Sequence, residues 1–445
     1  MNAKKFLIFS ISLGLAIQTN AQGWSLRQCL DHALDKNIQI QQSRLQEASA
    51  EADLWQARGE LFPSLNFSTT QSIGYRPFEE TMAVVQNGQV TTTDNRFTYQ
   101  GSYGLNASLT LWNGGINQKN IEAQKLQGKI AELQTRQNEQ SIQEQIAQLY
   151  VQIMYSAEAV RVNQQLEQTA KSQYDRGQQM MEQGQMSRAD VAQLEAQWRS
   201  AQYDVVSGET TVANLKRQLK ALLQLPMEQE FDVSGTFPSE SQVLEPLPSK
   251  EETLRSALSQ RAEIKSAQLD IAAADLQRDI ARRGFLPTVS LNAGIGESHY
   301  SGSQKSVGEQ MKTNLNMSAG VTLSVPILDN RRNRTNVKKA VLQQQTARLS
   351  LEDKKTTLSS TIEELWLNAA SGQQRYLSAK AQTQSQKTSY DLLDEQFKNG
   401  LKNIVELLQG RDQLLNAKQS ELQSKYQTLL NIQLLKFYTG EEIRL

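Results

Sequence analysis

The chain has 445 residues, of which 38% are hydrophobic, and its 47 basic and 47 acidic residues balance to a net charge of zero. After the first 20 residues, no stretch is apolar and long enough for a membrane-spanning helix, which needs about 20 such residues. The balanced charge and the lack of a basic patch interleaved with aromatic residues argue against nucleic-acid binding. The glutamine-rich composition instead favours polar helices.

The N-terminus has the features of a secretory signal peptide. A positive start at Lys4 and Lys5 is followed by an apolar run that ends at Ile17, and Ala21 is a small residue before the expected cleavage. The alternative is a membrane anchor, but the run is short and no stop-transfer pattern flanks it. We therefore predict that residues 1–21 are a cleaved signal and that the protein is exported.

The mature sequence contains two similar halves. A shift of 224 residues aligns the first segment with a later one, and beyond Gly104 the shift becomes 216. The change falls between Pro63 and Gly104, so a loop there is longer in the first half. We predict a first structural repeat over 22–225, a connector with four prolines over 226–249, and a second repeat over 250–445. Residues that match at the first shift are Leu30, Ala33, Leu34, Ile40, Leu45, Ala50, Ala57 and Pro63 with Leu254, Ala257, Leu258, Ile264, Leu269, Ala274, Ala281 and Pro287.

Each half is predicted to contain a helix, two strands, a long helix and a further helix. The strand segments alternate between apolar and small or polar residues, which is the period of a β-strand. They cover residues 65–75, 103–111, 289–296 and 315–325. Such strands fit a half-buried antiparallel sheet in a soluble domain. They also fit an outer-membrane barrel that is apolar toward lipid and polar toward a lumen.

The membrane alternative places a condition on the assembly. Four strands cannot close a barrel, and unpaired strand edges find no hydrogen-bond partners in lipid. Several chains would therefore have to share one barrel.

Two very long helices follow the strands. No proline occurs between Gly115 and Pro226, and apolar residues recur every three or four positions to about Met181. A helix of about 65 residues is roughly 100 Å long. The matching helix of the second half is expected from about 331 to 398. Such helices pack along one another as coiled coils, either around a water-filled interior or as a filamentous bundle.

Several motifs occur in an order that is similar to one known family. The motifs are SLRQCLDHALDKN (25–37), LFPSLNFS (61–68), LTLWNGG (109–115), EQGQMSRADVAQLEAQ (182–197), FLPTVSLN (285–292) and NGLKNIVELLQGRD (399–412). Together they resemble the outer-membrane efflux (TolC-like) family: its opening helix, its helix-to-strand and strand-to-helix junctions, and its periplasmic helix–turn–helix ends.

The resemblance implies a mostly α-helical fold with β-barrel strands. A long coiled-coil α-helical barrel would continue a transmembrane β-barrel, to which each chain of a homotrimer gives four strands. The outer loops would cover about 76–98 and 297–313. The resemblance also implies an outer-membrane location with a large periplasmic part. Its partners would be a periplasmic adaptor protein, an inner-membrane transporter and outer-membrane lipid.

The same resemblance implies a closure of the tunnel at the periplasmic helix ends. When the sequence is aligned on Gly400, Glu406 takes the position of an acidic ring. Gln409 takes a second ring position, where the family carries an acid, so one ring would be lost. The alternative for Glu406 is a solvated helix charge. Gly184 and Gly400 are expected in the turns between helices, where positive φ is needed, and would mark the adaptor-docking ends.

Polar links between neighbouring helices hold the closed state in that family. Lys402 and Asp190 match a basic and an acidic partner, Ser187 lies near a hydroxyl position, and Phe397 replaces a tyrosine. A bridge from Lys402 to Asp190 would be exposed and worth about 0–1 kcal/mol, which suits a contact that must break. The alternative is two unrelated surface charges.

Nothing in the sequence indicates catalysis, a cofactor or a metal site. His32 and His299 have no metal-ligating neighbour at useful spacing and are expected to be structural. The single cysteine, Cys29, cannot form an internal disulfide. We predict an exit channel of a tripartite efflux or type I secretion system, with a periplasmic coiled-coil scaffold as the alternative.

Overall fold

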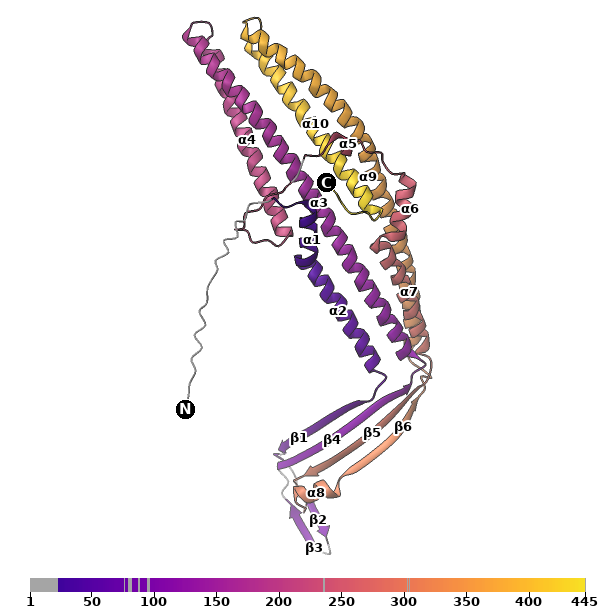
Figure 1. Ribbon diagram of the computed structural model, residues 1–445. Coiled ribbons are helices and arrows are strands. Elements are labelled where there is room, and N and C mark those ends of the chain that lie inside the picture. Colours follow the sequence, from indigo (N-terminus) through magenta and orange to yellow (C-terminus); the bar gives the residue numbers. More distant parts are fainter. Residues whose placement is uncertain are drawn as a thin grey trace, which may run out of the picture. The chain divides into compact units, whose positions relative to one another are not determined.

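The computed structural model describes residues 23–75, 77–78, 82–86, 89–93, 97–234, 237–301, 303 and 305–444 (Figure 1). The predicted signal peptide lies outside the described residues. The chain divides into two compact units, and each takes residues from both halves of the sequence. The helical unit draws on Met1–Gln42, Arg136–Arg261 and Thr356–Leu445, and the strand-bearing unit on Ser43–Thr135 and Ala262–Lys355.

Helices at corresponding places in the two halves have equal lengths. α1 and α6 have 11 residues, α2 and α7 have 22, α3 and α9 have 67, and α4 and α10 have 35. Both long helices were predicted within a few residues. Among the described residues, no helix is both long enough and apolar enough to cross a membrane. The bounds are α1 Leu26–Lys36, α2 Ile38–Gly59, α3 Ile116–Glu182, α4 Arg188–Leu222, α5 Glu240–Val243, α6 Lys250–Gln260, α7 Ala262–Arg283, α8 Val307–Thr313, α9 Arg332–Lys398 and α10 Ile404–Tyr438.

The opening helix of each half, expected as one element, is two helices. Asn37 has extended backbone angles (φ −63°, ψ 127°), and its side-chain oxygen accepts from the Gln39 and Ile40 amides at 2.9 and 3.3 Å. This caps α2 and interrupts the helix. Arg261 breaks the second half at the matching position with φ −62° and ψ 134°. The apolar periodicity continues across both breaks, so the sequence pattern did not reveal them.

Four strands form one antiparallel sheet in the order β1-β4-β5-β6. Ser64 of β1 lies opposite Ser108 of β4, and Thr288 of β5 lies opposite Ser324 of β6. All four strands lie where the alternation predicted them. The bounds are β1 Ser64–Tyr75, β4 Phe97–Trp112, β5 Thr288–Tyr300 and β6 Asn316–Ser324.

The segments expected as outer loops contain regular structure. A two-stranded hairpin of β2 (Met82–Gln86) and β3 (Gln89–Thr93) lies within 76–98, and α8 lies within 297–313. The first four residues of the second segment belong to β5, which extends to Tyr300. This extension pairs with β4, and the Gln310 side chain of α8 in addition bonds both the N–H and the C=O of Tyr300.

The sheet leaves both outer edges and much of its apolar surface uncovered within the described chain. β1 pairs only with β4, and β6 pairs only with β5. Every described residue of β6 is exposed. Large apolar side chains stay exposed on all four strands: Leu65, Phe67, Ile73, Tyr103, Leu105, Leu291, Met317, Val321 and Leu323. A sheet of this kind needs a further partner to cover its edges.

Left-handed backbone turns join the strands to the long helices. Gly114 and Gly115, before α3, have φ of 69° and 77°. Asn330 and Arg331, before α9, have φ of 52° and 64°. The paired glycines suit this conformation, whereas an arginine adopts it at some cost.

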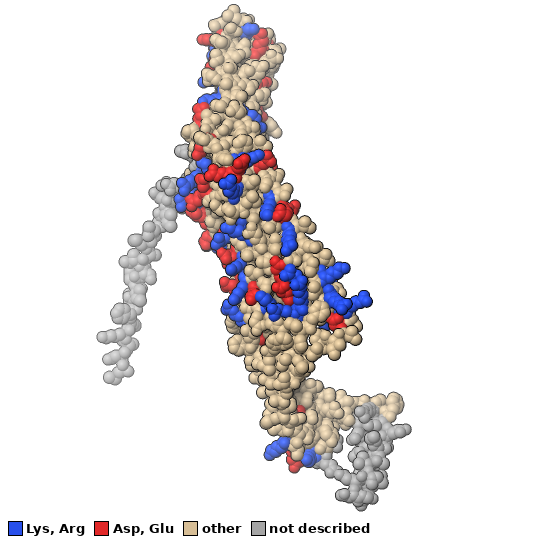
Figure 2. All heavy atoms as spheres, turned by 90° about the vertical axis from the view of Figure 1, so that its right-hand side faces the viewer, with Lys and Arg blue, Asp and Glu red and all other residues tan. Residues whose placement is uncertain are grey.

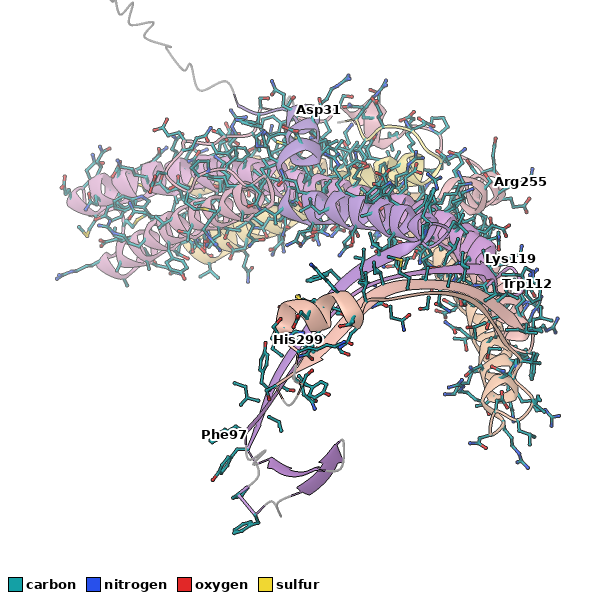
Figure 3. All side chains as sticks on the ribbon, turned by 90° about the horizontal axis from the view of Figure 1, so that it is seen from below. Asp31, Phe97, Trp112, Lys119, Arg255 and His299 are labelled. Atoms are coloured by element: carbon teal, nitrogen blue, oxygen red, sulfur yellow. The ribbon has the colours of Figure 1, made fainter. Side chains whose placement is uncertain are left out.

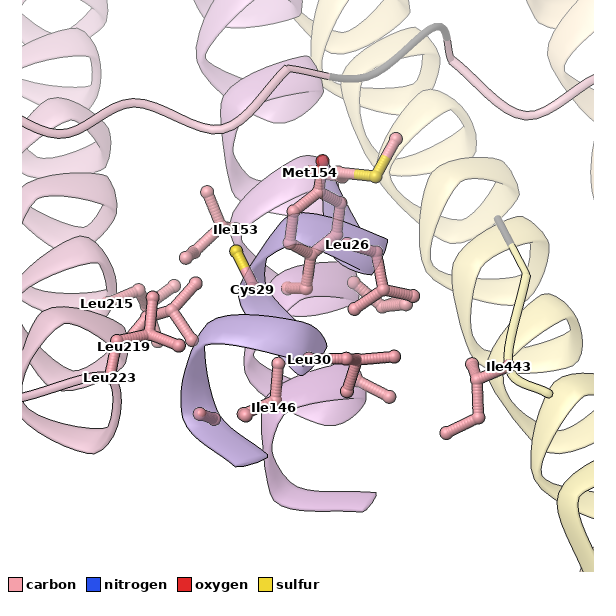
Figure 4. Packing of buried hydrophobic residues seen from close by; sticks show 14 of the residues in the cluster. Leu26, Cys29, Leu30, Ile146, Ile153, Met154, Leu215, Leu219, Leu223 and Ile443 are labelled. Carbon is pink, nitrogen blue, oxygen red and sulfur yellow. The ribbon is translucent and has the colours of Figure 1, made fainter. Parts of the chain in front are cut away.

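The core of the helical unit is formed where α1 packs against α3, α4 and α10 (Figure 4). Tyr150 of α3 is among its largest buried side chains, and its hydroxyl donates to the Trp24 carbonyl at 3.1 Å. The same hydroxyl bonds the Ser234 carbonyl, which attaches the connector to the core. The connector is also tied at its other end, because the Lys436 ammonium lies 2.7 Å from the Glu245 carboxylate.

Cys29 lies inside this core and should report on unfolding. Its side chain is fully buried, and burial raises the pKa of the thiol to about 12. The reactive thiolate is therefore scarce at neutral pH in the folded protein. We expect maleimide labelling to be negligible in the native state and to rise with denaturant along the unfolding curve measured by circular dichroism. Rapid labelling of the native protein would contradict this packing.

Candidate functional site at the ends of the helical hairpins

Two helical hairpins, α3–α4 and α9–α10, end in turns of the same construction. In the first turn Gly184 has φ of 72°, and the Gln185 amide reaches back to the Met180 carbonyl at 2.8 Å. In the second, Gly400 has φ of 73°, and the Leu401 amide bonds the Gln396 carbonyl at 2.9 Å. These are glycine-terminated helix ends, as the sequence predicted. A side chain added at either glycine would meet no neighbour, so the backbone angle alone requires glycine.

The next helix starts with a side-chain cap in both hairpins. Ser187 accepts from the Asp190 amide at 3.1 Å and donates to the Asp190 carboxylate at 2.7 Å. Asn403 accepts from the Glu406 amide at 2.9 Å, and the Glu406 carboxylate accepts from the Asn403 amide at 3.4 Å. Three residues expected at a gate, Ser187, Asp190 and Glu406, thus serve first as helix caps.

Lys402 bonds Glu406 rather than Asp190. Its ammonium lies 2.9 Å from the Glu406 carboxylate, one helical turn away. The Lys402 hydrogen bond holds the pKa of the Glu406 carboxyl below its usual range, and the Asn403 amide adds to this. No contact between Lys402 and Asp190 occurs among the described residues of the single chain, where Asp190 is held by its own cap. The expected link between these two residues is therefore absent within one chain.

The two hairpins instead meet through an apolar cluster near their ends. Leu194 of α4 is buried against Ile404 and Leu408 of α10. The partly buried residues Met186 and Phe397 pack against this cluster. Phe397 therefore contributes packing where the family was expected to carry a hydroxyl. Gln409, the second ring position, is exposed.

Polar groups also join the hairpins. The Gln173 amide of α3 donates to the Tyr390 hydroxyl at 3.0 Å and to the Asp394 carboxylate at 2.9 Å, both on α9. The side-chain amide of Gln197 of α4 also lies against the guanidinium of the buried Arg411 of α10. The sequence reasoning missed these links, which bring together residues more than 200 positions apart.

The packing of the two helices within each hairpin does leave a signal in the sequence. A Cβ built at Gly177 would lie 2.6 Å from Leu194, and one built at Gly410 would lie 2.6 Å from Leu393. With the 216-residue shift, Gly177 corresponds to Leu393 and Leu194 to Gly410. Each hairpin thus pairs one leucine with one glycine. The glycine lies on the first helix of the first hairpin and on the second helix of the second hairpin.

Comparison with known proteins identifies the family to which this architecture belongs. The family described as "Outer membrane efflux protein" matches residues 29–224 and 253–441, nearly all of both halves. The chain belongs to the outer membrane efflux protein family. Members of this family are transport proteins of the outer membrane with a large periplasmic helical part, and they are not enzymes.

Individual relatives are distant in sequence but cover the chain. "Outer membrane protein TolC" of Salmonella enteritidis is 22% identical over 99% of this chain and 87% of its own length. "Alkaline protease secretion protein AprF" of Pseudomonas aeruginosa is 20% identical over 71% of this chain and 64% of its own. A crystal structure of CusC, described by its transmembrane channel formation, superimposes with a TM-score of 0.77 and 19% identity. The match covers 94% of this chain and 92% of that one.

Proposed function

We propose that three copies of this chain form one outer-membrane exit channel of a tripartite efflux or type I secretion system. A periplasmic adaptor protein would dock on the hairpin ends marked by Gly184 and Gly400. An inner-membrane transporter would deliver the substrate, which then leaves through the periplasmic tunnel and the membrane barrel. Family membership supports the efflux function, and the sheet supports the assembly.

The observation that carries the proposal is the open four-stranded sheet. Both of its outer edges, β1 and β6, lack a strand partner within the described chain, and its apolar side chains are exposed. In lipid every backbone polar group needs a partner. If β6 of one chain pairs with β1 of the next, three chains close a twelve-stranded barrel.

We infer further that the two halves are repeats of one structural unit. The equal helix lengths support this, as do the positive-φ residues, which lie at 114, 115, 184 and 224 and again 216 positions later. The register agrees as well. Shifting the pair Ser64 and Ser108 by 224 and 216 residues gives Thr288 and Ser324, which are paired. A barrel built from six such hairpins would be regular.

The hairpin ends are the proposed gate. The apolar cluster around Leu194 and the bonds from Gln173 hold the two hairpins of one chain together. Opening requires one hairpin to move away from the other, so these contacts stabilise the closed state. Glu406 and Gln409 would face the narrow end of the tunnel. Three copies of the Glu406 carboxylate would favour cations there.

Removing Lys402 should strengthen this cation preference. In the Lys402→Ala variant the Glu406 carboxylate loses its counter-charge and the hydrogen bond that lowers its pKa. We expect greater cation selectivity at neutral pH. Because the pKa of Glu406 rises toward its ordinary value, we also expect that selectivity to be lost at a higher pH than in wild type when the solution is acidified. Reversal potentials in a KCl gradient, measured across the acidic range, test both points.

Lys398→Ala is the matched control, because it removes a lysine that pairs with Asp394 at 2.5 Å one turn before the hairpin end. It should leave the pH profile unchanged. Identical profiles for wild type and Lys402→Ala would remove Glu406 from the gate.

A flotation assay separates the channel from a periplasmic coiled-coil scaffold. The mature protein, reconstituted from detergent, should float with lipid vesicles after a high-salt wash and release an encapsulated dye. A scaffold would stay in the aqueous fraction without detergent and release none, and that result would overturn the proposal.

A further inference from the structure

The strand-bearing unit has a long uncharged span on every strand. No Asp, Glu, Lys or Arg occurs in residues 61–75, 97–118, 284–296 or 313–328. Figure 2 shows the sheet region without charged spheres between two charged zones. At about 3.3 Å per residue, the 12 uncharged residues of β1 extend for roughly 40 Å, which crosses a hydrocarbon layer of about 30 Å when the strand is tilted. In Figure 3, Trp112 and Lys119 mark the helix side of this span and Phe97 its far end.

A set of cations borders the helix side of this span. We name it the basic collar: Arg282, Arg331, Arg332, Arg334, Lys338 and Lys339. All six are exposed, and none forms an ion pair with another described residue. Positions 331 to 339 cover about 12 Å along the start of α9 and the residue before it, enough to span the headgroup layer of one leaflet, about 5–8 Å deep.

The surrounding structure holds the collar together and leaves its cations without ion pairs among the described residues. The Asn333 side-chain amide donates to the Gly284 carbonyl at 2.7 Å, which joins the start of α9 to the end of α7. Two carboxylates close to the collar in the sequence have other partners. Asp329 accepts from the Asn333 amide at 2.7 Å, and Asp279 pairs with Arg278 at 3.0 Å. None of the collar cations forms an ion pair with either of these carboxylates.

Helix stability does not explain these cations. Arg332 and Arg334 lie in the first turn of α9, where the helix dipole disfavours positive charge, and that turn has no acidic residue. Arg331 has φ of 64°, a conformation that favours glycine. Arg332 and Arg334 are thus unfavourable for the helix dipole, and Arg331 is unfavourable for its backbone angle.

The first half shows that the fold does not need them. At the 216-residue shift, Arg331, Arg334 and Lys339 correspond to Gly115, Gln118 and Ala123. The first-half turn has the same left-handed backbone, and α3 has the same length as α9. Neutral residues at these three positions therefore support an equivalent junction, whereas Arg282 has a counterpart in Arg58 at the 224-residue shift. The junction does not require the charges of Arg331, Arg334 and Lys339.

We propose that the basic collar binds the headgroups of anionic phospholipids in the periplasmic leaflet of the outer membrane. This rests on the proposed function, because it requires the sheet to lie in the bilayer. The helical part of the family is periplasmic, so the collar, on the helix side of the uncharged span, lies at that leaflet. Arginine suits phosphate because its planar guanidinium donates two parallel hydrogen bonds. The collar would thereby fix the depth of the sheet in the membrane.

The test compares lipid selectivity in reconstituted full-length protein. Spin-labelled phosphatidylglycerol and phosphatidylcholine are introduced as probes into phosphatidylcholine bilayers, and the fraction of each probe immobilised by the protein is measured. The test variant R331G/R334Q/K339A inserts the residues that the first half carries. The control R217Q/R255Q/K387Q removes three exposed cations elsewhere. A further sample of each protein contains inorganic phosphate at the concentration of the spin-labelled lipid.

Wild type and control should immobilise phosphatidylglycerol about fivefold more strongly than phosphatidylcholine, since one surface cation near an anionic leaflet contributes about that factor. The test variant, which keeps Arg282, Arg332 and Lys338, should show a clearly smaller preference, and molar salt should reduce the preference of wild type. Phosphate should change little, which distinguishes a lipid surface from a free anion site. Equal selectivity in wild type and test variant would overturn the inference. So would a test variant that no longer assembles on a native gel, because the collar would then be a contact between chains.

Failure of the proposed function gives a different result. If the sheet does not enter the bilayer, neither probe is immobilised by any of the proteins, including wild type. If the sheet enters but the collar does not bind anionic lipid, both probes are immobilised equally.

Discussion

Cysteines introduced together at Thr70 and Thr322 should join three copies of the chain into one covalent trimer on mild oxidation. The expected register follows from the two halves. Within one chain, Asn106 of β4 lies opposite Gly294 of β5. Shifting Asn106 by 216 residues and Gly294 back by 224 gives Thr322 of β6 opposite Thr70 of β1. Both threonines are exposed on the edges of the sheet.

The geometry excludes a bond within one chain. Two strands separate β1 from β6, so the cysteines lie at least about 14 Å apart across the sheet, and they are also offset by eight residues along it. Both separations exceed the roughly 7 Å that a disulfide allows. Non-reducing gels should therefore show dimers and trimers for the double variant and monomers for each single variant. Cys29 is buried and should not interfere.

An out-of-register pair provides the control. Thr70→Cys with Ser318→Cys moves one cysteine four residues along β6, about 13 Å from the expected partner. If this pair cross-links as well as the first, the register inferred from the repeat is wrong. If neither pair cross-links in the membrane-inserted protein, β6 and β1 do not meet between chains.

Replacing Leu194 by alanine should open the gate. Leu194 is 1% exposed and packs against Ile404 and Leu408 of the second hairpin. A buried Leu→Ala change typically costs about 2–5 kcal/mol. If opening separates the hairpins, most of this cost falls on the closed state and shifts the open–closed equilibrium by on the order of 100-fold. Single-channel recordings should show a much higher open probability.

Two controls separate gating from loss of stability. Leu194→Met keeps the volume and should keep the wild-type open probability. Leu219→Ala removes a fully buried leucine of the same helix in the main helical core, away from the hairpin ends. It should lower the melting temperature without changing the open probability. Equal gating in Leu194→Ala and Leu219→Ala would show that the cluster near the hairpin ends is not the gate.

The sequence was most informative where one physical period repeats over many residues. Alternation over 65–75 and 315–325 located two strands, and the proline-free, three- to four-residue pattern located both long helices. The pattern did not predict a helix break that depends on a single side chain. Asn37 interrupts a helix by capping the next one while the apolar spacing continues unchanged. The β2–β3 hairpin was not predicted, because its strands are only five residues long and too short for a clear alternation.

The candidate site was predicted in position but not in its contacts. Gly184 and Gly400 were expected in turns because glycine tolerates positive φ, and both adopt it. The partner of Lys402 was not predictable in the same way, because a lysine near two carboxylates bonds the one that lies on its own helical turn. The bond between Gln173 and Tyr390 depends on how two hairpins pack, which sequence periodicity does not encode.

Single-channel recording of the mature protein in a planar bilayer tests the central claim most directly. We expect discrete openings of uniform size, carried by trimers and favouring cations, with Leu194→Ala open for more of the time than wild type. A protein that forms no conducting unit, and that remains dissolved without detergent, would contradict the shared barrel and leave a periplasmic coiled-coil scaffold as the explanation of the long helices.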